Sequence, residues 1–406
     1  MKGSVIARND SDEAIYVKYK KISMELKRYK LGEIGEIRMC KRILKEETNS
    51  VGGVPFFKIG TFGGQADVFI TKEKFEEYKN AYSYPKKGDV LISAAGTIGR
   101  TVVFDGKDAY FQDSNIVWIE NDESKVLNEY LFYCYKNIRW TTSVGSTILR
   151  LYNDDIRNTD IIVPPLSEQK KIASVLSVLD DKIALNKKMN QKLEAMAKRL
   201  YDYWFVQYDF PDKNGLPYKT TGGPMTNNPT LKREIPTGWE VKTIGDYLKI
   251  GNGRDHSKLA DGLYPVYGSG GVMRYVSEFL HDGETVLFPR KGTLNNVMYR
   301  NEPLWTVDTM FYTSVLVPHS ALFVFYSAKM FDFERLNTGT GVPSMTSDII
   351  KKLPIISPDR QTLEQFDKTV AKLYNQIHHN EKEISRLTKL RDKLLPLLMN
   401  GQVEVK

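Results

Sequence analysis

Three observations predict an α+β protein built from two globular β-rich domains and two long helices. An internal repeat joins residues 145–154 to residues 339–348 at an offset of 194. A heptad pattern of apolar residues follows each copy, which is typical of long helices that pack in pairs. Short β-branched and aromatic runs separated by Gly and Asp turns precede each helical pattern. Two diverged copies of one unit therefore explain the sequence best.

The repeat extends through the end of each β-rich region. Residues 158–169 align with residues 352–363 at the same offset of 194, so Pro164 lies on Pro358. In both copies a short apolar run ends at proline and leads into the helical pattern, and looser matches continue upstream in the same order. The composition then divides the chain into an unassigned charged arm at 1–28, a first β-rich domain at 29–165, a long helix at 166–206, a connector rich in Pro, Gly, Asn and Thr at 207–238, a second β-rich domain at 239–358, and a second long helix with the C-terminal tail at 359–406.

The two helices carry the strongest periodicity. Apolar positions alternate four and three residues apart, and a helix from 167 to 203 would be about 55 Å long at 1.5 Å per residue. A small domain cannot bury so long a helix, so we expect the two helices to pack on each other. The predicted seams are Ile172, Leu176, Leu179, Ile183, Asn186, Asn190, Leu193, Ala197, Leu200 and Trp204, and Phe366, Val370, Leu373, Ile377, Asn380, Ile384, Leu387, Arg391, Leu394 and Leu398.

Two asparagines interrupt the seams at equivalent positions. Asn186 and Asn380 lie 194 residues apart, where a polar residue reduces stability but selects register and partner. Tolerated polar positions are the alternative reading. Ser167 marks the start of the first helix, and Thr362 with Gln365 forms a capping-box pattern at the start of the second.

Composition bounds the class of protein. The chain has 406 residues, a formal net charge of +8, 27% charged residues and 41% hydrophobic residues, which suits a soluble globular protein with two or three domains. The longest apolar stretch, 321–328, is far shorter than the roughly 20 residues that cross a bilayer, and the first 30 residues are too charged for a secretory signal. Cys40 and Cys134 form no CxxC pair, so we expect a cytoplasmic protein.

No catalytic constellation is found. A P-loop of the form GxxxxGK[ST] is absent, and the Pro164-Pro165 pair has apolar flanks, unlike the polar motif with which amino-methyltransferases hold a base. Asp212 and Glu240 mimic a nuclease pattern, but Asp212 lies in the connector. The neighbours His378 and His379 would point about 100° apart on a helix, so they do not form a metal pair. We therefore expect no catalytic residue, no metal and no cofactor in this chain.

A duplicated turn carries the candidate binding chemistry. The turn at 93–100 and its copy at 289–296 combine glycines, hydroxyls and cationic or amide side chains, which can follow a phosphate backbone or read base edges. An ordinary hairpin turn is the alternative for either loop alone. The candidates in these turns and in the neighbouring segments are Ser93, Gly96, Thr97, Arg100 and Arg150 in the first copy, and Arg254, Lys258, Tyr267, Arg274, Arg290, Lys291, Thr293, Asn295 and Asn296 in the second.

Taken in order, these features resemble the DNA specificity subunit of type I restriction-modification systems. The resemblance covers nearly all of residues 29–402. It rests on GDVLISAAGTIG at 88–99, on the domain endings at 160–183 and 354–373, and on the helix exits at 200–211 and 394–405. The second copy departs from GTIG, since it has Gly-Thr-Leu-Asn at 292–295, so its loop is expected to contact DNA differently.

The resemblance implies two target recognition domains, each reading one half of a bipartite, asymmetric site in double-stranded DNA. It further implies that the helices pair in antiparallel fashion about a pseudo-twofold and set the spacer between the half-sites. The subunit would be non-catalytic and would assemble with two methylation subunits and with restriction subunits. S-adenosylmethionine, ATP and Mg²⁺ would bind only to those partners.

The aromatic cluster at the end of the first helix is a candidate docking site for a methylation subunit. Packing within the chain is the alternative for its members Tyr201, Tyr203, Trp204 and Phe205. Two other functions stay open. A self-sufficient restriction or methylation enzyme would need the missing cofactor and metal motifs, and a non-catalytic protein-binding scaffold would lack salt-dependent DNA affinity.

Overall fold

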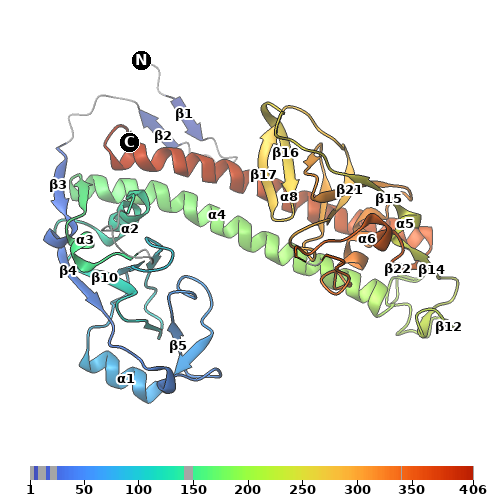
Figure 1. Ribbon diagram of the computed structural model, residues 1–406, viewed down its shortest axis with the longest axis horizontal. Helices are drawn as coiled ribbons and strands as arrows, with labels where there is room; N and C mark the ends of the chain where they lie inside the picture. The colour runs from blue at the N-terminus through green and yellow to red at the C-terminus, as the bar shows by residue number, and fades with distance from the viewer. Residues whose placement is uncertain (1–3, 8–14, 19–24, 141–149, 340, 406) are drawn as a thin grey trace. The chain divides into compact units, whose positions relative to one another are not determined.

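The computed structural model describes residues 4–7, 15–18, 25–140, 150–339 and 341–405, with the backbone alone described at 4–7 and 15–18. It divides into two compact units (Figure 1), which we call unit 1, made of Met1–Leu185 and Glu383–Lys406, and unit 2, made of Asn186–Lys382. The first five positions of the repeated segment at 145–154, and Thr340 in its copy, lie outside the described residues.

The β-rich region of unit 1 contains two sheets and a closing strand pair. An antiparallel four-stranded sheet has the order β4-β10-β7-β8, and a three-stranded sheet has the order β6-β5-β9 with β5 and β9 parallel. The strands are β4 (Gly35–Met39), β10 (Ile116–Asn121), β7 (Val90–Ser93), β8 (Thr101–Val103), β6 (Val68–Ile70), β5 (Val54–Phe57) and β9 (Tyr110–Phe111). Strand β3 (Lys27–Lys30) pairs with β11 (Asp160–Val163), so the two ends of this β-rich region meet.

Short helices complete unit 1. They are α1 (Lys72–Ala81), α2 (Asn128–Asn137) and α3 (Asn153–Arg157), with 3-10 turns η1 (Leu31–Glu33) and η2 (Lys45–Glu47). Helix α1 begins after Thr71, whose side chain accepts a hydrogen bond from the Lys74 backbone N–H at 3.2 Å. Helix α2 buries Tyr130, Leu131 and Cys134 against the core that α4 shares.

Unit 2 repeats this topology. Its four-stranded sheet has the order β15-β21-β18-β19, its three-stranded sheet has the order β17-β16-β20 with β16 and β20 parallel, and β14 pairs with β22. The strands are β14 (Glu240–Thr243), β15 (Leu248–Asn252), β16 (Asp261–Gly268), β17 (Gly271–Val276), β18 (Glu284–Pro289), β19 (Met298–Asn301), β20 (Trp305–Thr306), β21 (Met310–Val315) and β22 (Pro354–Ser357). The predicted duplication is confirmed.

The helices of unit 2 also correspond to those of unit 1, with one difference. They are α5 (Ile244–Tyr247), α6 (Ala321–Ala328) and α7 (Ser347–Lys351). Helix α6 is buried all round, which accounts for the longest apolar stretch of the sequence. The described residues between β17 and β18 form no helix, whereas α1 lies between β6 and β7 in unit 1.

The predicted long helices are α4 (Leu166–Tyr201), followed by a π-turn η3 (Asp202–Val206), and α8 (Arg360–Met399). Helix α8 begins before the predicted Thr362 because Asp359 accepts hydrogen bonds from the Thr362 N–H at 2.9 Å and the Thr362 hydroxyl at 2.7 Å. Within the described ranges, every helix is too short or too polar to span a lipid bilayer.

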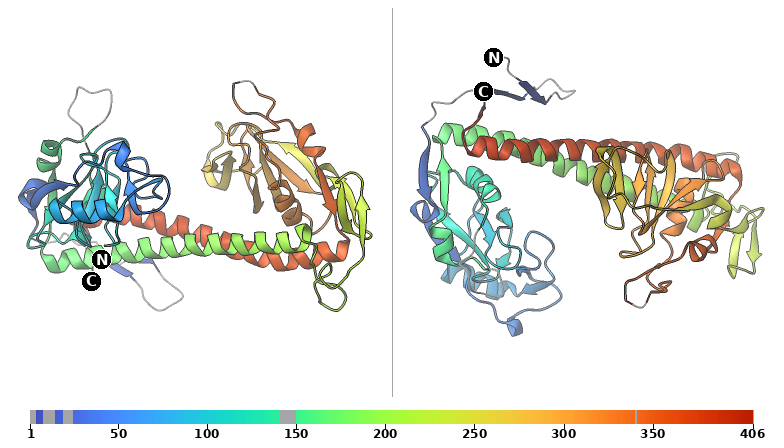
Figure 2. Two further views of the ribbon diagram at one scale, coloured as in Figure 1. Left: turned by 90° about the horizontal axis from the view of Figure 1, so that it is seen from below. Right: turned by 45° about the horizontal axis from the view of Figure 1, so that its top comes forward.

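The two long helices run antiparallel (Figure 2), and the packing within each unit establishes this by itself. In unit 1, Ile172, Leu176 and Ile183 from the first half of α4 share a core with residues from the end of α8, namely Leu387, Leu394 and Leu398. In unit 2, Tyr201 at the end of α4 shares a core with Phe366 near the start of α8. The heptad seams were therefore predicted correctly as a pairing surface.

The hydrogen-bond partner of Asn380 in the helix seam is Asn190 and not Asn186, its equivalent in the repeat. Both predicted register residues, Asn186 and Asn380, are buried. Asn380 Nδ2 donates to Asn190 Oδ1 at 2.8 Å, and Gln376 Nε2 donates to Asn380 Oδ1 at 2.8 Å. In an antiparallel pair a residue faces the one at the mirrored position, so the equivalent asparagine of the repeat need not be its partner.

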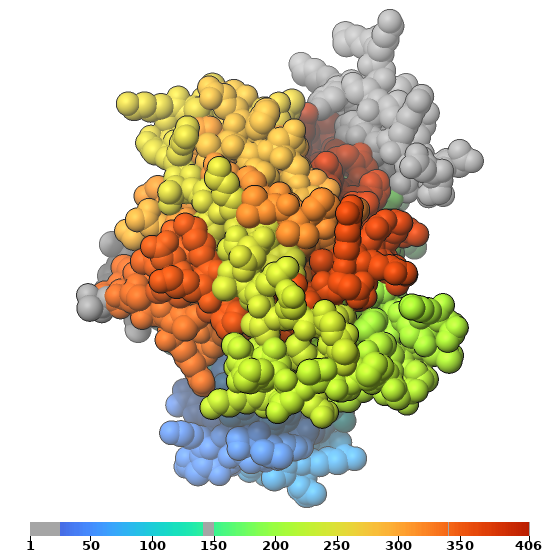
Figure 3. Space-filling model, turned by 90° about the vertical axis from the view of Figure 1, so that its right-hand side faces the viewer, coloured from blue at the N-terminus to red at the C-terminus, as the bar shows by residue number. Residues whose placement is uncertain are grey.

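The segment at 207–238 is more ordered than the predicted extended connector. It contains a hairpin of β12 (Met225–Asn228) and β13 (Arg233–Pro236). The Phe210 ring stacks on Trp239 at 4.8 Å between centroids and on Tyr218 at 4.6 Å, which fixes the segment to the unit 2 core. Figure 3 shows this segment, in yellow-green, on the near surface of unit 2.

The N-terminal arm, left unassigned from sequence, contributes two strands. Strand β1 (Ser4–Ala7) pairs with β2 (Ile15–Lys18), and β2 pairs with β23 (Glu404–Val405) after α8. The two ends of the described chain therefore meet in one three-stranded sheet.

Candidate nucleic-acid interface

In unit 1 the predicted turn after β7 is held between two other segments. The Ala94 N–H donates to the Asn115 carbonyl at 2.8 Å, and the Leu151 N–H donates to the Ala94 carbonyl at 2.7 Å. A β-bridge joins Ala95 to Arg150. The structure therefore brings Arg150, predicted from a distant part of the sequence, against the turn at 93–100.

The residues of this turn have different roles. Ser93 is buried, accepts a hydrogen bond from the Arg100 N–H at 2.8 Å and donates to the Thr97 carbonyl at 2.5 Å, so it shapes the turn and does not face a partner. Gly96 is exposed with a φ of +64°, a conformation that favours glycine. Thr97 and Arg100 are exposed, and Arg100 Nη1 donates to the Phe62 carbonyl at 2.8 Å.

A hollow beside this turn contains residues that sequence reasoning missed. It measures about 470 Å³, and Arg42, Lys58 and Gln112 line it together with Arg150. Lys58 and Gln112 meet because each follows one strand of the parallel pair β5–β9, and Arg42 is held beside them by its ion pair with Asp113 at 2.9 Å. No local sequence pattern predicts this contact, because the strands of a parallel pair lie far apart in the sequence.

In unit 2 the predicted loops also gather around one turn. The Gly253 N–H donates to the Met310 carbonyl at 3.0 Å, and the Arg290 N–H donates to the Thr309 carbonyl at 2.8 Å. A β-bridge joins Lys291 to Ser344, at the place where Ala95 meets Arg150 in unit 1. The exposed predicted residues here are Arg254, Lys258, Arg290, Lys291, Thr293 and Asn295.

Two residues of unit 2 that were predicted to contact DNA, Tyr267 and Arg274, form hydrogen bonds within the unit. Tyr267 is 3% exposed, donates to Glu302 Oε1 at 2.9 Å and accepts from Arg300 Nε at 2.7 Å. Burial raises the pKa of Tyr267, so its hydroxyl stays neutral. Arg274 donates to Asp261 Oδ1 at 2.7 Å and to the Leu259 carbonyl at 3.0 Å. Tyr267 is therefore corrected to a core residue, and Arg274 acts first as a brace of its own hairpin.

The two predicted asparagines brace the turn from within. Asn295 Oδ1 accepts from the Phe333 N–H at 2.8 Å, and Asn296 Nδ2 donates to the Ser269 carbonyl at 2.6 Å. Asn295 stays exposed, whereas Asn296 is half-buried. The charged side chains of this turn that face solvent are those of Arg290 and Lys291, which precede the two asparagines.

The aromatic cluster predicted to dock a partner is mostly buried. Tyr201, Trp204 and Phe205 are 5%, 6% and 1% exposed in the core of unit 2, and Tyr203 is half-buried. Tyr201 Oη lies 3.0 Å from Ser327 Oγ, and the rings of Phe205 and Phe366 lie 4.9 Å apart. The structure therefore supports the alternative, packing within the chain, for the three buried rings.

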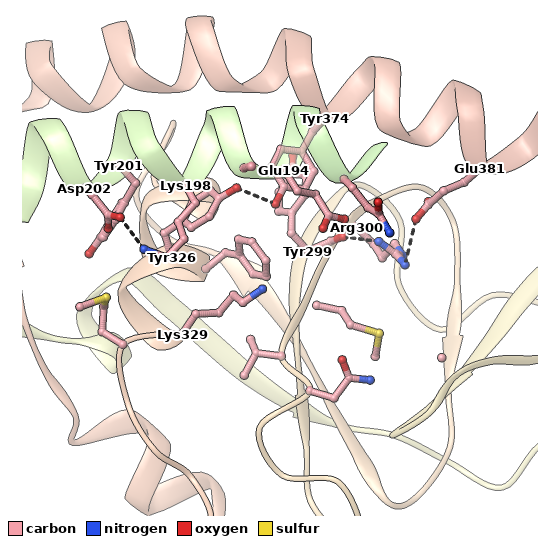
Figure 4. Close-up of a pocket in the computed structure, with 18 of the residues that line it drawn as sticks. Glu194, Lys198, Tyr201, Asp202, Tyr299, Arg300, Tyr326, Lys329, Tyr374 and Glu381 are labelled. Atoms are coloured by element: carbon pink, nitrogen blue, oxygen red, sulfur yellow. Dashed lines mark hydrogen bonds and ion pairs between the residues drawn. The ribbon is translucent and has the colours of Figure 1, made fainter. Parts of the chain in front are cut away.

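A cavity of about 670 Å³ lies beside that cluster (Figure 4), between α4, α6, α8 and β19 of unit 2. Ion pairs among its lining residues join Lys198 to Asp202, and Arg300 to Glu381 at 3.7 Å. Tyr326 and Tyr374 hydroxyls lie 3.0 Å apart, and burial raises the pKa of Tyr326 to about 12. Such paired charges and neutral hydroxyls suit binding rather than proton transfer. Among the described residues no group of three or more His, Cys, Asp or Glu is arranged to hold a metal ion.

Two copies of one β-rich fold, each followed by a long helix and each with cationic residues on the loops beside its four-stranded sheet, define a protein built by internal duplication. The model of the type I restriction modification DNA specificity domain matches residues 24–195 and again residues 236–389. The chain belongs to this family, and the resemblance seen in the sequence is confirmed.

Relatives span the chain to different extents. A putative type I restriction enzyme specificity subunit of Haemophilus influenzae is 61% identical over 146 residues, which cover 36% of this chain and only 38% of that protein. The type I restriction enzyme MjaIX specificity subunit of Methanocaldococcus jannaschii is 26% identical over 94% of this chain and 97% of its own length.

A solved structure shares the fold. The crystal structure of a type I restriction-modification S subunit from M. genitalium matches with a TM-score of 0.65 and 17% identity, over 94% of this chain and 98% of that one. The predicted α+β architecture is confirmed.

Proposed function

We propose that this chain is a DNA specificity subunit of a type I restriction-modification complex. Each β-rich unit reads one half of a bipartite, asymmetric site in double-stranded DNA. The chain itself performs no catalysis, and it takes no cofactor. Adenine methylation and ATP-dependent cleavage belong to methylation and restriction subunits that assemble with it, in the cytoplasm.

One observation carries the proposal: equivalent backbone sites in the two units hold cations at different positions. The hydrogen bond from the Ala94 N–H to Asn115 corresponds to that from the Arg290 N–H to Thr309. Unit 2 therefore has Arg290 and Lys291 where unit 1 has alanines at 94 and 95. Unit 1 instead has Arg150 where unit 2 has Ser344. One scaffold with two different sets of donors suits two different half-sites.

The strand pairs β3–β11 and β14–β22 support a modular arrangement. Each pair joins the first and last strands of one β-rich region, so the two ends of that region lie side by side. These strand pairs support the proposal that the recognition domains are the segments 29–165 and 239–358. We expect them to exchange between relatives as units, with α4 and α8 setting the spacer.

The methylation subunits are expected to dock on the helices and beside the aromatic cavity of unit 2. The half-buried Tyr203 and the exposed Lys198 and Lys329 remain accessible there.

The test is methylation-sensitive genome sequencing of cells that carry the chain with its methylation subunit. A bipartite adenine-methylated motif should appear, and exchange of residues 239–358 for another recognition domain should change one half only. No motif that depends on the chain, or a change in both halves together, contradicts the proposal. DNA affinity of the complex should also fall steeply with salt, because a pure protein scaffold has no phosphate contacts to lose.

A further inference from the structure

The hollow beside the turn at 93–100 of unit 1 is lined by more cationic than acidic residues. Four cationic residues line it, Arg42, Lys45, Lys58 and Arg150, against one acidic residue, Asp113. Another hollow of unit 1, between α2 and α4, has the opposite balance, with Glu123, Glu129, Asp180 and Asp181 against Lys87 and Lys170. A polyanion is therefore drawn to the first hollow and repelled from the second.

Internal hydrogen bonds fix which groups the first hollow offers. The Ile59 N–H donates to Gln112 Oε1 at 2.9 Å, and a backbone N–H needs an acceptor, so the amide N–H₂ of Gln112 is left to donate. Arg150 Nη2 donates to the Ser114 carbonyl at 3.1 Å, and Arg42 Nε donates to Asp113 Oδ2 at 2.9 Å. Each of these bonds uses one of the five N–H groups of a guanidinium.

The backbone that holds Arg150 is itself constrained. Ser114 has a φ of +52°, in the left-handed region that non-glycine residues adopt at a cost of order 1 kcal/mol. Its neighbour Asn115 accepts the N–H of Ala94 in the turn. The Arg150 guanidinium is therefore hydrogen-bonded to a loop that is itself bonded to the turn, and such support helps a side chain to hold the orientation that base reading requires.

A surface that presents donors suits a base edge that presents acceptors. In the major groove guanine offers the acceptors N7 and O6, whereas adenine and cytosine each offer an amino donor and thymine offers a methyl group beside its acceptor. Building on the proposed function, we propose that this hollow reads a guanine in the unit 1 half-site. Arg150 supplies paired donors to N7 and O6, with Gln112 and Arg42 beside it.

The second unit lacks these donors at the equivalent places. The hydrogen bond from the Gln112 N–H to Phe57 corresponds to that from the Val307 N–H to Tyr267, so Val307 occupies the position of Gln112 and Gly268 that of Lys58. Ser344 occupies the position of Arg150. The guanine subsite is thus specific to unit 1.

The same donors would also suit a backbone phosphate, and two variants separate the two ligands. Arg150→Lys keeps the charge for a phosphate but loses the planar pair of donors for guanine. Gln112→Glu keeps an acceptor for the Ile59 N–H but replaces the free donor by an acceptor. Arg157→Lys is the matched control, because Arg157 lies on α3 outside the hollow and pairs with Asp154.

The experiment sequences methylated adenines in cells that carry each full-length variant with the methylation subunit. For Arg150→Lys, preference for guanine should fall about tenfold or more at one position of the unit 1 half, while the other half stays unchanged. Gln112→Glu should lower methylation of the wild-type motif by a similar factor and raise it at a base that presents an amino donor. Arg157→Lys should leave the motif unchanged.

Three outcomes overturn the inference. They are a wild-type unit 1 half without guanine, an Arg150→Lys motif identical to wild type, and a uniform loss of methylation with no relaxed position, which indicates a phosphate contact. Copurification of each variant with the methylation subunit verifies folding. If the wild-type chain directs no bipartite motif at all, the proposed function fails instead, and the two failures are distinguishable.

Discussion

The two units hold their β-rich regions against the long helices by different chemistry at equivalent positions. Asp180 on α4 and Tyr374 on α8 are 194 residues apart and correspond in the repeat. In unit 1, Asp180 accepts from Tyr133 Oη at 3.2 Å, Lys136 Nζ at 3.0 Å and Arg391 Nη1 at 2.7 Å. This set of residues is the ionic clamp.

In unit 2 the corresponding contact is aromatic. Tyr374 meets Tyr326 hydroxyl to hydroxyl at 3.0 Å, and its ring lies 5.1 Å from that of Tyr299 and 5.9 Å from that of Phe325. One fold has thus kept a contact while exchanging charge for apolar surface. Packing of the β-rich region against the long helices should therefore depend on ionisation in unit 1. In unit 2 it should not.

The largest expected effect tests the aromatic side of this comparison. Phe366→Ala removes a fully buried ring that contacts Tyr201, Trp204 and Phe205, and we expect a loss of roughly 3–5 kcal/mol in the free energy of unfolding. Ile172→Ala, at the equivalent position of unit 1, removes a smaller side chain and is the matched comparison.

Hydrogen exchange of backbone amides in the assembled complex localises these two effects. Phe366→Ala should speed exchange in residues 186–382, and Ile172→Ala should speed it in the other unit. Equal acceleration in both units for either variant would show that the units do not hold separate cores.

The ionic clamp should give an effect of intermediate size. Asp180→Asn removes the carboxylate that Lys136 and Arg391 share, while Arg391 keeps its ion pair with Asp392 at 2.7 Å. We expect a loss of about 1–3 kcal/mol in the free energy of unfolding of unit 1, measured by urea unfolding. Tyr374→Phe, the corresponding change in unit 2, removes only a hydroxyl contact and should cost about 1 kcal/mol. A larger loss for Tyr374→Phe than for Asp180→Asn would reverse the comparison.

Acid should distinguish the two contacts as well. Burial alone would raise the pKa of Asp180, but hydrogen bonds from Arg391 and Lys136 outweigh burial and lower it. A lowered pKa stabilises the fold at pH values above about 3.9, the usual pKa of aspartate, and this stability is lost as the pH falls through the lower folded value. The difference in stability between wild type and Asp180→Asn should therefore shrink below about pH 4.

The long helices could be predicted from the sequence because their pattern is periodic and repeated. Tertiary contacts between segments far apart in the sequence could not be predicted. Heptad spacing identifies α4 and α8 because a helix pair needs a stripe at that period. The same stripe cannot tell whether the rings at 201, 204 and 205 face a partner or the chain's own core, because both environments select aromatic residues. Unit 2 has the apolar α6 at that point, and it covers them.

The candidate site was predicted in part for a similar reason. The turn at 93–100 stands out because it occurs twice, and the structure does bring Arg150 to it. Lys58 and Gln112 were not predicted, because they lie 54 residues apart in the sequence and only the parallel pairing of β5 with β9 brings them together. Tyr267 was misjudged because a tyrosine in a Gly-rich segment has the same appearance whether it is exposed or is bonded to Glu302 and Arg300.

The smallest expected effect concerns the seam itself. Asn380 pairs with Asn190, but the repeat places Asn186 and Ile384 at the corresponding positions, so the polar pair is not reproduced by the duplication. Either single change to leucine, Asn190→Leu or Asn380→Leu, should cost about 1 kcal/mol because it strands a buried amide. The double variant should recover most of that loss, giving a coupling of about 1 kcal/mol in a double-mutant cycle. Additive losses would mean that each asparagine acts through its other neighbours, among them Gln376 and the Ile377 carbonyl, and that the pair does not select the register of the helices.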